Sequence, residues 1–446
     1  MTKKQILAFG MLGFSKDLLL CFSGGLLMLY LTDSLQLATT LVGGILFFNR
    51  FFDAFSDVLA AYLLEKFSEY LKKCYLIGII SSLIVFMALF SVNSYMPKPL
   101  IVVAVCVLYF ILDIFYTMMD VSYWSLLPRF STDDDTRAHL SSVATFFSSF
   151  AALICFTSAL PLLHLFGGNR GFSSLTLVIA FLVASFVLLA YPHLPNLQPR
   201  AIVSKSVSPK EIFQVLLSNK LFFAYALYFF FFQLSFEWMN AYNIYYFKYS
   251  INREYFYSIY AFTILAQLFG AGFYLKLNQY LSKQGIFYLS AALSVLGMSG
   301  LFALGQILPS NIPLLFLFAS IKQIGSGLFM VTATHDLSLV IEVNESETGK
   351  NFPAILTAGK LLLAKLSTSV TALGSGFGLH LAGYVSNQEQ TPHTAFLISL
   401  QTFGVPIVFI IISLACYSAF KRLYQHDKNK PTKMDLFSES YEKFLG

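Results

Sequence analysis

Charged residues are scarce in this chain of 446 residues. Only 12% of its residues are Asp, Glu, Lys or Arg, about half the share usual in a soluble domain. Hydrophobic residues make up 57%. This composition excludes a soluble enzyme and predicts an all-α membrane protein with many transmembrane helices. The net charge of +6 comes from basic residues in short loops, which suits the inner face of a membrane and does not indicate a nucleic-acid partner.

Several chemical signatures are also missing. The five cysteines show no CxxC spacing, so we expect small buried residues and neither a disulfide nor a metal centre. The absence of a Walker A pattern argues against an ATP-driven pump. HExxH, GxSxG and Gly-rich dinucleotide fingerprints are absent as well. The sequence therefore predicts neither an enzyme nor a cofactor, apart from a coupling ion.

Long apolar runs fill most of the chain. A run of about 20 residues is long enough to cross a bilayer as a helix, and twelve such runs can be read. They are predicted at 7–31, 37–64, 75–95, 99–127, 139–166, 171–193, 219–247, 255–275, 284–305, 311–334, 352–383 and 392–420.

A longer polar segment divides these twelve spans into six and six, as in transporters built from two parallel halves. We expect a six-helix bundle over 1–193, a cytoplasmic loop over 194–218, a second bundle over 219–420 and a cytoplasmic tail over 421–446. Most of the 29 Lys and Arg residues then fall in loops on one side. By the positive-inside rule both termini are cytoplasmic, and the expected location is the cell (inner) membrane.

The second span carries an unusual load of charge. Arg50, Asp53 and Asp57 follow i, i+3, i+7 spacing and so share one helix face, with Ser56 beside them. An ionised side chain at the bilayer centre costs about 2.5–3.5 kcal/mol on insertion scales. Carboxylates one turn apart suit a proton or a small hard cation such as Na⁺. The alternative, that Arg50 neutralises one aspartate, leaves one charge unexplained. Arg50 could tune the aspartates or close a gate.

The first span places Lys16 and Asp17 near mid-depth. Adjacent helical residues point about 100° apart and could address different partners across a cavity. The alternative is a local ion pair that only lets the helix insert.

The fourth span carries a polar stripe that we expect to share one face. A carboxylate, a hydroxyl and an indole along one stripe form a plausible site for a sugar. The indole alone would indicate an interfacial belt residue. The stripe consists of Asp113, Tyr116, Thr117, Asp120 and Trp124.

The second half holds fewer intramembrane charges. Lys360 and Lys365 on the eleventh span could face the excess carboxylates of the first half. Lys322 and Glu237 could be structural partners of other groups. His335–Asp336 is interpreted as a solvated loop or helix end.

Four stretches resemble one transporter family. They are 15–33 (SKDLLLCFSGGLLMLYLTD), 49–63 (NRFFDAFSDVLAAYL), 116–137 (YTMMDVSYWSLLPRFSTDDDTR) and 166–172 (FGGNRGF). They are similar to the glycoside–pentoside–hexuronide:cation symporters of the major facilitator superfamily. The resemblance is weaker in the second half, where Lys365 is its main anchor. It implies the major facilitator fold, two six-helix bundles, and symport of a solute with H⁺ or Na⁺.

The resemblance also implies roles for individual residues. Asp53, Asp57 and Thr117 match the family's cation site, and Ser56 stands at an asparagine ligand of that site. Asp17, Asp120 and Trp124 match sugar-binding residues, with Lys16 and Tyr116 beside them. Lys365 matches a lysine between the two sites, where we expect it to act in coupling together with Arg50.

Departures from the family pattern concern mainly the sugar pocket. Thr145 stands at a sugar-binding arginine, and Met330 and Lys360 replace a tryptophan and a glutamine. Val58 replaces a proline after the second aspartate of span two. The missing arginine and the additional Lys360 favour an anionic sugar such as a hexuronide as one hypothesis. Ser56 leaves H⁺ and Na⁺ open and favours H⁺ slightly.

The sequence thus predicts a cation-coupled secondary transporter of a sugar, glycoside, uronide or similar small polar solute that works by alternating access. Its expected partners are the solute, a monovalent cation and the lipid bilayer, and we expect a monomer. One alternative is a transporter of a lipid or another non-sugar solute on the same fold. A second alternative is a membrane sensor that does not transport.

Overall fold

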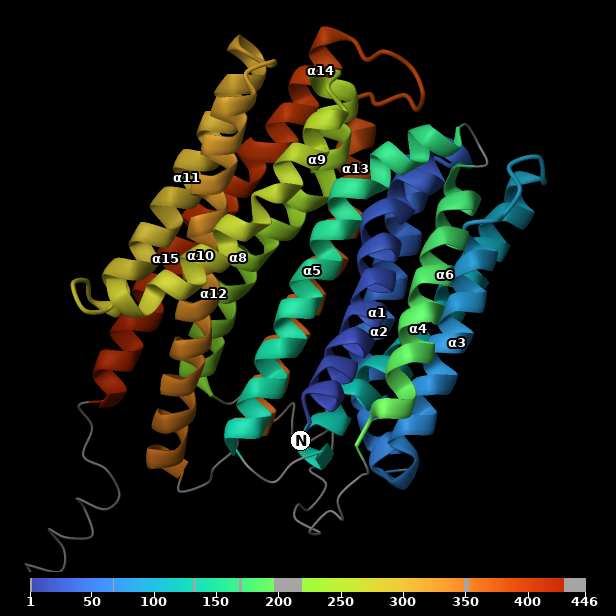
Figure 1. The fold of residues 1–446 in the computed structure, drawn as a ribbon. Helices are drawn as coiled ribbons and strands as arrows, with labels where there is room; N and C mark the ends of the chain where they lie inside the picture. Colours follow the sequence, from blue (N-terminus) through green and yellow to red (C-terminus); the bar gives the residue numbers. More distant parts are fainter. Residues whose placement is uncertain are drawn as a thin grey trace, which may run out of the picture. The chain divides into compact units, whose positions relative to one another are not determined.

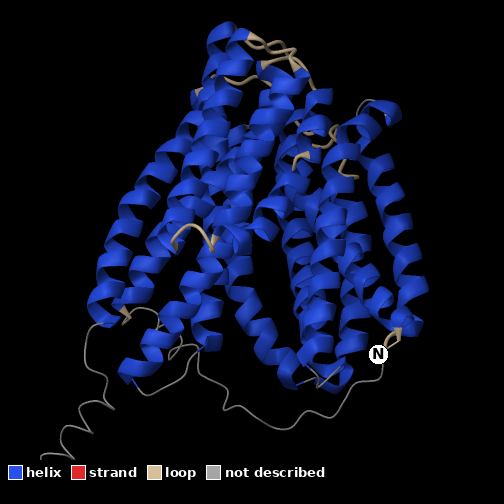
Figure 2. Cartoon of the chain, turned by 60° about the vertical axis from the view of Figure 1, so that its left-hand side comes forward, coloured by secondary structure: helices blue, strands red, loops and turns tan. Residues whose placement is uncertain are grey.

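The computed structural model consists of long helices joined by short turns (Figures 1 and 2). It describes residues 2–66, 68–130, 134–167, 171–195, 219–348 and 353–428. These residues contain no β-strand. The first helices are α1 (Lys3–Leu29), the π-helical turn η1 (Tyr30–Ser34), α2 (Thr39–Lys66), η2 (Ser68–Tyr70), α3 (Leu71–Leu89), α4 (Lys98–Phe130), α5 (Asp134–Phe166), α6 (Gly171–Ala190) and η4 (Tyr191–His193).

The later part of the chain, from Lys220 to Lys428, is also built from helices. Every predicted span overlaps a helix or a run of consecutive helices, although the bounds differ. The later elements are α8 (Lys220–Tyr245), the π-helical turn η5 (Tyr246–Ser250), α9 (Tyr255–Phe262), α10 (Ile264–Leu277), α11 (Lys283–Ile307), α12 (Ile312–Thr348), α13 (Pro353–Leu381), α14 (Pro392–Ser399), the π-helical turn η6 (Leu400–Gly404) and α15 (Val405–Lys428).

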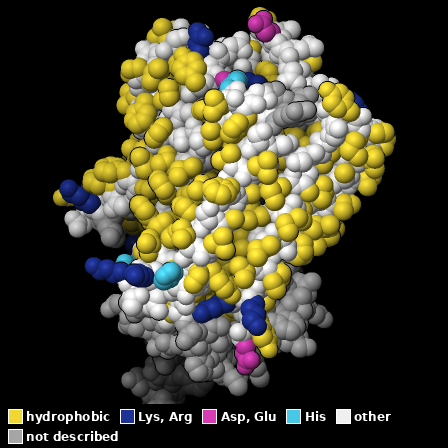
Figure 3. Space-filling view, turned by 45° about the vertical axis from the view of Figure 1, so that its right-hand side comes forward, with side chains coloured by type: hydrophobic (Ala, Val, Ile, Leu, Met, Phe, Trp, Pro, Cys, Tyr) yellow, Lys and Arg dark blue, Asp and Glu magenta, His cyan; other side chains and the backbone are white. Residues whose placement is uncertain are grey.

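Ten helices or helix runs of the described residues are long and apolar enough to cross a membrane. The chain is therefore a multi-pass membrane protein. The charge-bearing helices α2 and α13 are not among the ten. Hydrophobic side chains cover most of the face drawn in Figure 3, and residues such as Phe181 and Leu188 are exposed. Lipid tails would cover such a surface.

The chain divides into two compact units. The first comprises Met1–Ser206, Asn243–Phe262 and Ala372–Ile398, and the second comprises Val207–Tyr242, Thr263–Thr371 and Ser399–Gly446. The first unit thus contains α1–α6 together with η5 and α9. The division into bundles over 1–193 and 219–420 stays a prediction.

Small residues bring helices together within the second unit. A Cβ on Gly327 of α12 would lie 2.1 Å from the backbone oxygen of Gln267 on α10, so only glycine permits this approach. One turn away, a Cβ on Gly270 would lie 2.5 Å from the backbone oxygen of Ile324. Glycine contacts of this kind are typical of membrane helices, where close backbone packing replaces the hydrophobic effect as the main source of association.

One turn geometry occurs twice in the first unit. The α1 run ends in η1, where the Leu35 amide donates to the Tyr30 oxygen, and Gln36 follows with φ of 54°. The α8 run ends in η5 with the same bond, from Ile251 to Tyr246. The second turn repeats the first residue for residue, including a positive φ of 51° after it, at Asn252.

The structure corrects one interpretation. The predicted tenth span ended at residue 334, but α12 continues to Thr348. Asp336 therefore does not lie in a solvated loop or at a helix end. It is buried, and its carboxylate accepts a hydrogen bond of 2.8 Å from the Tyr228 hydroxyl. Sequence reasoning missed this because the partner lies on α8, 108 residues away.

Candidate functional site

Two hydrogen bonds join α2 to α4 in the first unit. The Thr117 hydroxyl donates to Asp53 Oδ1 over 3.0 Å. One turn earlier on both helices, the Asn49 amide donates to Asp113 Oδ2. The partners are 64 residues apart in each case, so the two helices run parallel and in register here. Asp53 is 8% exposed, and its burial makes a neutralising partner or ion necessary.

A cavity of about 230 Å³ lies beside these bonds. Asp53, Ser56, Asn49 and Asp113 supply its polar lining, and aromatic side chains supply much of the rest. Ser56 donates to the backbone oxygen of Asp53 over 3.1 Å, and this bond leaves the lone pairs of its hydroxyl oxygen available. Arg50 interacts electrostatically with both Asp53 and Asp113. One guanidinium is thus shared between two carboxylates.

The structure brings together three of the four residues predicted to bind the cation. The side chain of the fourth, Asp57, lies outside the described part of the chain. Among the described residues, no group of three or more His, Cys, Asp or Glu side chains could hold a metal ion. Sodium binding at Asp53 and Asp57 therefore stays a prediction.

A second charged cluster lies on α1 and α4 of the same unit. Lys16 is 3% exposed, and its Nζ lies 2.6 Å from Asp17 Oδ1 and 2.8 Å from Asp120 Oδ1. The Ser148 hydroxyl of α5 donates to the other oxygen of Asp17. Lys16 and Asp17 do form a local pair, but the pair extends to a third charged group on another helix. Two carboxylates share one ammonium, which leaves the cluster with a formal charge of −1.

Aromatic side chains flank this cluster. Lys16 Nζ lies 5.2 Å from the ring centroid of Tyr123 and 5.3 Å from that of Trp124, within the range of cation–π attraction. Trp124 is 43% exposed, so part of its indole remains available to a ligand. Tyr116 interacts electrostatically with Asp120.

The polar residues predicted to form one stripe along α4 contact two different helices, α1 and α2. Asp113 and Thr117 pair with residues of α2, whereas Asp120 pairs with Lys16 of α1. The sequence predicted one shared face, and the structure divides it because α4 packs against both helices.

The lysines of α13 lie in the second unit. Lys360 Nζ donates to the Thr334 hydroxyl over 2.7 Å and lies 5.6 Å from the ring centroid of Phe229. The backbone oxygen of Lys365 accepts bonds from two hydroxyls of its own helix. The predicted roles of Lys360 in substrate binding and of Lys365 in coupling stay predictions.

The second unit contains a buried lysine and a partly buried glutamate that interact. Lys322 of α12 is 2% exposed and interacts electrostatically with Glu237 of α8. Gln233 donates to Glu237 over 2.9 Å. The sequence left the partners of Lys322 and Glu237 open, and their role stays a prediction.

Sequence reasoning missed two residues of these clusters. Asn49 precedes Asp53 by one helical turn, so its place on the charged face could have been read from i, i+4 spacing. No spacing in the sequence linked Ser148 to Asp17, because the two residues are 131 residues apart. The structure shows that Thr145, at the position of the missing arginine, bonds only its own helix in the contacts described, while Ser148 reaches Asp17.

Comparison with known proteins identifies the family. The family described as "MFS/sugar transport protein" matches residues 8–421. The lactose permease of Lactobacillus delbrueckii subsp. bulgaricus is 24% identical over 360 residues, which cover 76% of this chain and 56% of the permease. The chain thus spans little more than half of that relative. The isoprimeverose transporter of Lactiplantibacillus pentosus is 22% identical over 389 residues, 86% of this chain and 81% of the transporter.

Solved structures share the fold. A D-xylose–proton symporter superposes with a TM-score of 0.63 at 12% identity, covering 93% of this chain and 96% of the symporter. A bacterial homologue of the human lysosomal transporter Spinster, in an inward-facing conformation, gives a TM-score of 0.65 at 10% identity, covering 96% and 98%. At such identities the likeness establishes the fold alone, and that fold is the major facilitator fold.

Proposed function

The chain belongs to the MFS/sugar transport protein family, and we propose that it is a cation-coupled symporter of a sugar or sugar-like polar solute. It would work by alternating access in a cell membrane with both termini cytoplasmic. The sugars named for its relatives, lactose and isoprimeverose, are the first substrates to test. The coupling ion is H⁺ or Na⁺.

The observation that carries this proposal is the pair of charged clusters on one helix. Thr117 of α4 contacts the carboxylate of the cation cluster, and Asp120 of α4 contacts the ammonium of the other cluster. Three residues of α-helix rise about 4.5 Å, so α4 joins the two clusters rigidly. A shift of α4 caused by one ligand would be felt at the other site, as reciprocal coupling requires.

The cation would act by neutralising Asp53. Without the cation, Arg50 is shared between Asp53 and Asp113, so these three described side chains together have a formal charge of −1. A proton on Asp53, or Na⁺ among its carboxylate and the Ser56 and Thr117 hydroxyls, would neutralise this charge. The neutral cluster would favour the state that binds solute.

The solute would bind at the cluster of Lys16, Asp17 and Asp120. Sugar hydroxyls can donate to the two carboxylates, and the exposed part of Trp124 offers a plane on which a pyranose ring could stack. Because the cluster has a formal charge of −1, a neutral glycoside fits it better than an anionic uronide. A uronide would need a positive partner elsewhere, and Lys360 is the one proposed from the sequence.

Transport in proteoliposomes tests the proposal. One positive charge moved through 100 mV yields about 2.3 kcal/mol, which would drive accumulation of a neutral sugar by about 50-fold. We expect Asp53→Asn to abolish accumulation but to retain exchange of labelled for unlabelled sugar. The control is Glu69→Gln, the same chemical change at an exposed residue of η2.

Varying the pH gradient and the Na⁺ gradient separately would identify the ion. Accumulation of sugar by Asp53→Asn against a gradient would contradict the cation assignment. Failure of the unmodified protein to take up any neutral sugar, with a uronide or a lipid taken up instead, would contradict the proposed substrate class.

A further inference from the structure

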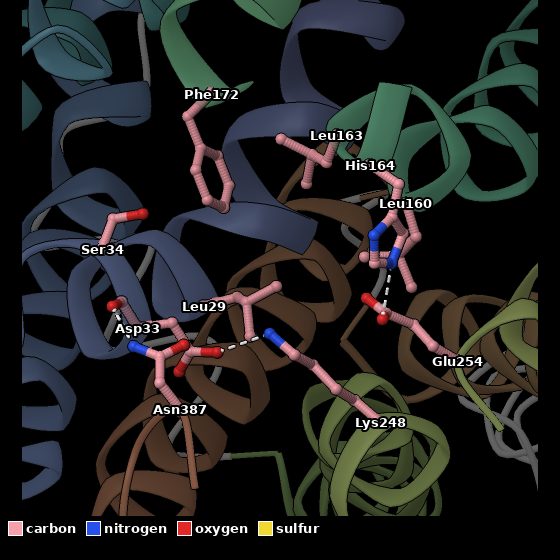
Figure 4. Close-up of a pocket in the computed structure, with 10 residues that line it drawn as sticks. All are labelled: Leu29, Asp33, Ser34, Leu160, Leu163, His164, Phe172, Lys248, Glu254 and Asn387. Atoms are coloured by element: carbon pink, nitrogen blue, oxygen red, sulfur yellow. Dashed lines mark hydrogen bonds and ion pairs between the residues drawn. The ribbon is translucent and has the colours of Figure 1, made fainter. Parts of the chain in front are cut away.

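A buried carboxylate lies at the end of the first helix run, outside both clusters described above. Asp33 belongs to η1 and is 7% exposed. Its Oδ2 accepts a hydrogen bond from Lys248 Nζ at 2.8 Å and another from the Tyr249 hydroxyl. Its Oδ1 accepts one from the Tyr384 hydroxyl at 2.6 Å. Asn387 Nδ2 donates to the backbone oxygen of Asp33 over 2.6 Å, as Figure 4 shows. Two of these donors, Lys248 and Tyr249, lie just after α8 in the chain, and the other two lie just after α13.

The surrounding residues hold these donors in place. The Tyr384 ring contacts those of Tyr245 and Tyr249 at centroid distances of 5.3 and 5.1 Å. Thr32 bonds both Asp33 and the Tyr245 hydroxyl. Asn387 has φ of 56°, a conformation that asparagine tolerates better than most residues. The segment after α13 thus turns back to reach η1.

A second pair of polar side chains lies nearby. His164 of α5 and Glu254, just before α9, are 2.7 Å apart. Both pairs line a cavity of about 250 Å³, and Ser34 lines it beside Asp33 (Figure 4). At both pairs, a residue of the helices before the long middle segment contacts a residue of the helices after it.

We infer that Asp33 and its four donors form a gate that closes one end of the transport pathway. The inference rests on the proposed alternating access, in which the early and late helices separate at each end in turn. With both termini cytoplasmic, η1 and η5 lie at the external end. The ion pair of the gate joins the two repeated turns, because Asp33 belongs to η1 and Lys248 belongs to η5.

The physics of the cluster makes it suited to open and close. The Asp33 side chain is 6% exposed and that of Lys248 is 24% exposed. A largely buried carboxylate becomes costly when its positive partner leaves, so small separations are unfavourable. Once water enters the cavity, the separated Asp33 and Lys248 are both solvated, and much of the cost disappears. The cluster would therefore favour a closed state and an open wet state over intermediates.

Reporter labelling at one fixed pH tests this gate without sugar and without Na⁺. Ser34→Cys would be introduced into the full-length protein purified in detergent, and its reaction with a maleimide would be followed by peptide mass spectrometry. We expect Asp33→Asn, and separately Lys248→Met, to accelerate labelling of this cysteine about tenfold by shifting the population towards the open state. Cys155 of α5, which is fully buried, serves as the internal control and should stay protected.

The outcomes distinguish a gate that opens from a contact that only stabilises the fold. Faster labelling of the reporter with Cys155 protected supports the gate. Unchanged labelling of the reporter, or acceleration at both cysteines together with a lower melting temperature, overturns it. Because the assay contains no sugar and no Na⁺ and is run at one fixed pH, a failure here is distinct from a failure of the proposed symport.

Discussion

Replacing Lys16 by an uncharged residue should leave the carboxylates of Asp17 and Asp120 without their positively charged partner. The Lys16→Met variant keeps an unbranched apolar stem but loses contacts of 2.6 and 2.8 Å. Breaking a buried ion pair by removing one partner costs about 3–5 kcal/mol. The Asp17 side chain is 11% exposed and that of Asp120 is 31% exposed, so water partly solvates the second charge. We therefore expect a loss of about 3 kcal/mol, the lower end of that range.

Unfolding of the purified protein in detergent would measure this loss. Lys73→Met, the same change at an exposed lysine, should alter stability by less than about 0.5 kcal/mol. The double variant Lys16→Met with Asp120→Asn removes one of the two unpaired carboxylates. It should recover about 1–2 kcal/mol of the lost free energy of unfolding. If Lys16→Met is as stable as the exposed control, or if the double variant is no better than the single one, the reasoning on this cluster is refuted.

Three further predictions concern single side chains. Gly327→Ala should cost about 1–3 kcal/mol through overpacking, because its Cβ would lie 2.1 Å from a backbone oxygen of α10. Gly272→Ala, whose Cβ meets nothing within 4 Å, should cost nothing in the same unfolding assay, and equal losses would contradict the packing argument. Tyr228→Phe leaves Asp336 without its 2.8 Å bond and should cost about 1.5–3 kcal/mol; a neutral result would argue against a charged carboxylate there. Thr117→Val should reduce cation-dependent uptake and Thr117→Ser should retain it; similar uptake by the two would exclude the hydroxyl as a ligand.

The sequence was sufficient to predict the helices and much of the α2 face. Apolar runs of bilayer length determine where helices form in such a chain. The i, i+3 spacing placed Asp53 and Ser56 on one side of α2, and both line the cavity there. These features depend on local spacing, which the sequence carries directly.

What the sequence could not supply was the choice of partner across long separations. Asp33 is 215 residues from Lys248 and 351 from Tyr384, and no local pattern links them. In the sequence, Asp33 simply follows a long apolar run. Asp336 was interpreted wrongly for the same reason, because its partner Tyr228 lies on α8. Ser148 reaches Asp17 only because α1 packs against α5.

The repetition of η1 in η5 has a consequence for evolution at the gate. Counted along the two turns, Asp33 and Tyr249 occupy the same position, and yet they contact each other. In a two-fold arrangement, a residue meets its own counterpart only at the symmetry axis, which in parallel repeats runs along the membrane normal. A faithful duplication would set two aspartates face to face there and repel the halves. Tyr249→Asp would create this contact between two carboxylates, and we expect it to destabilise the cluster around Asp33.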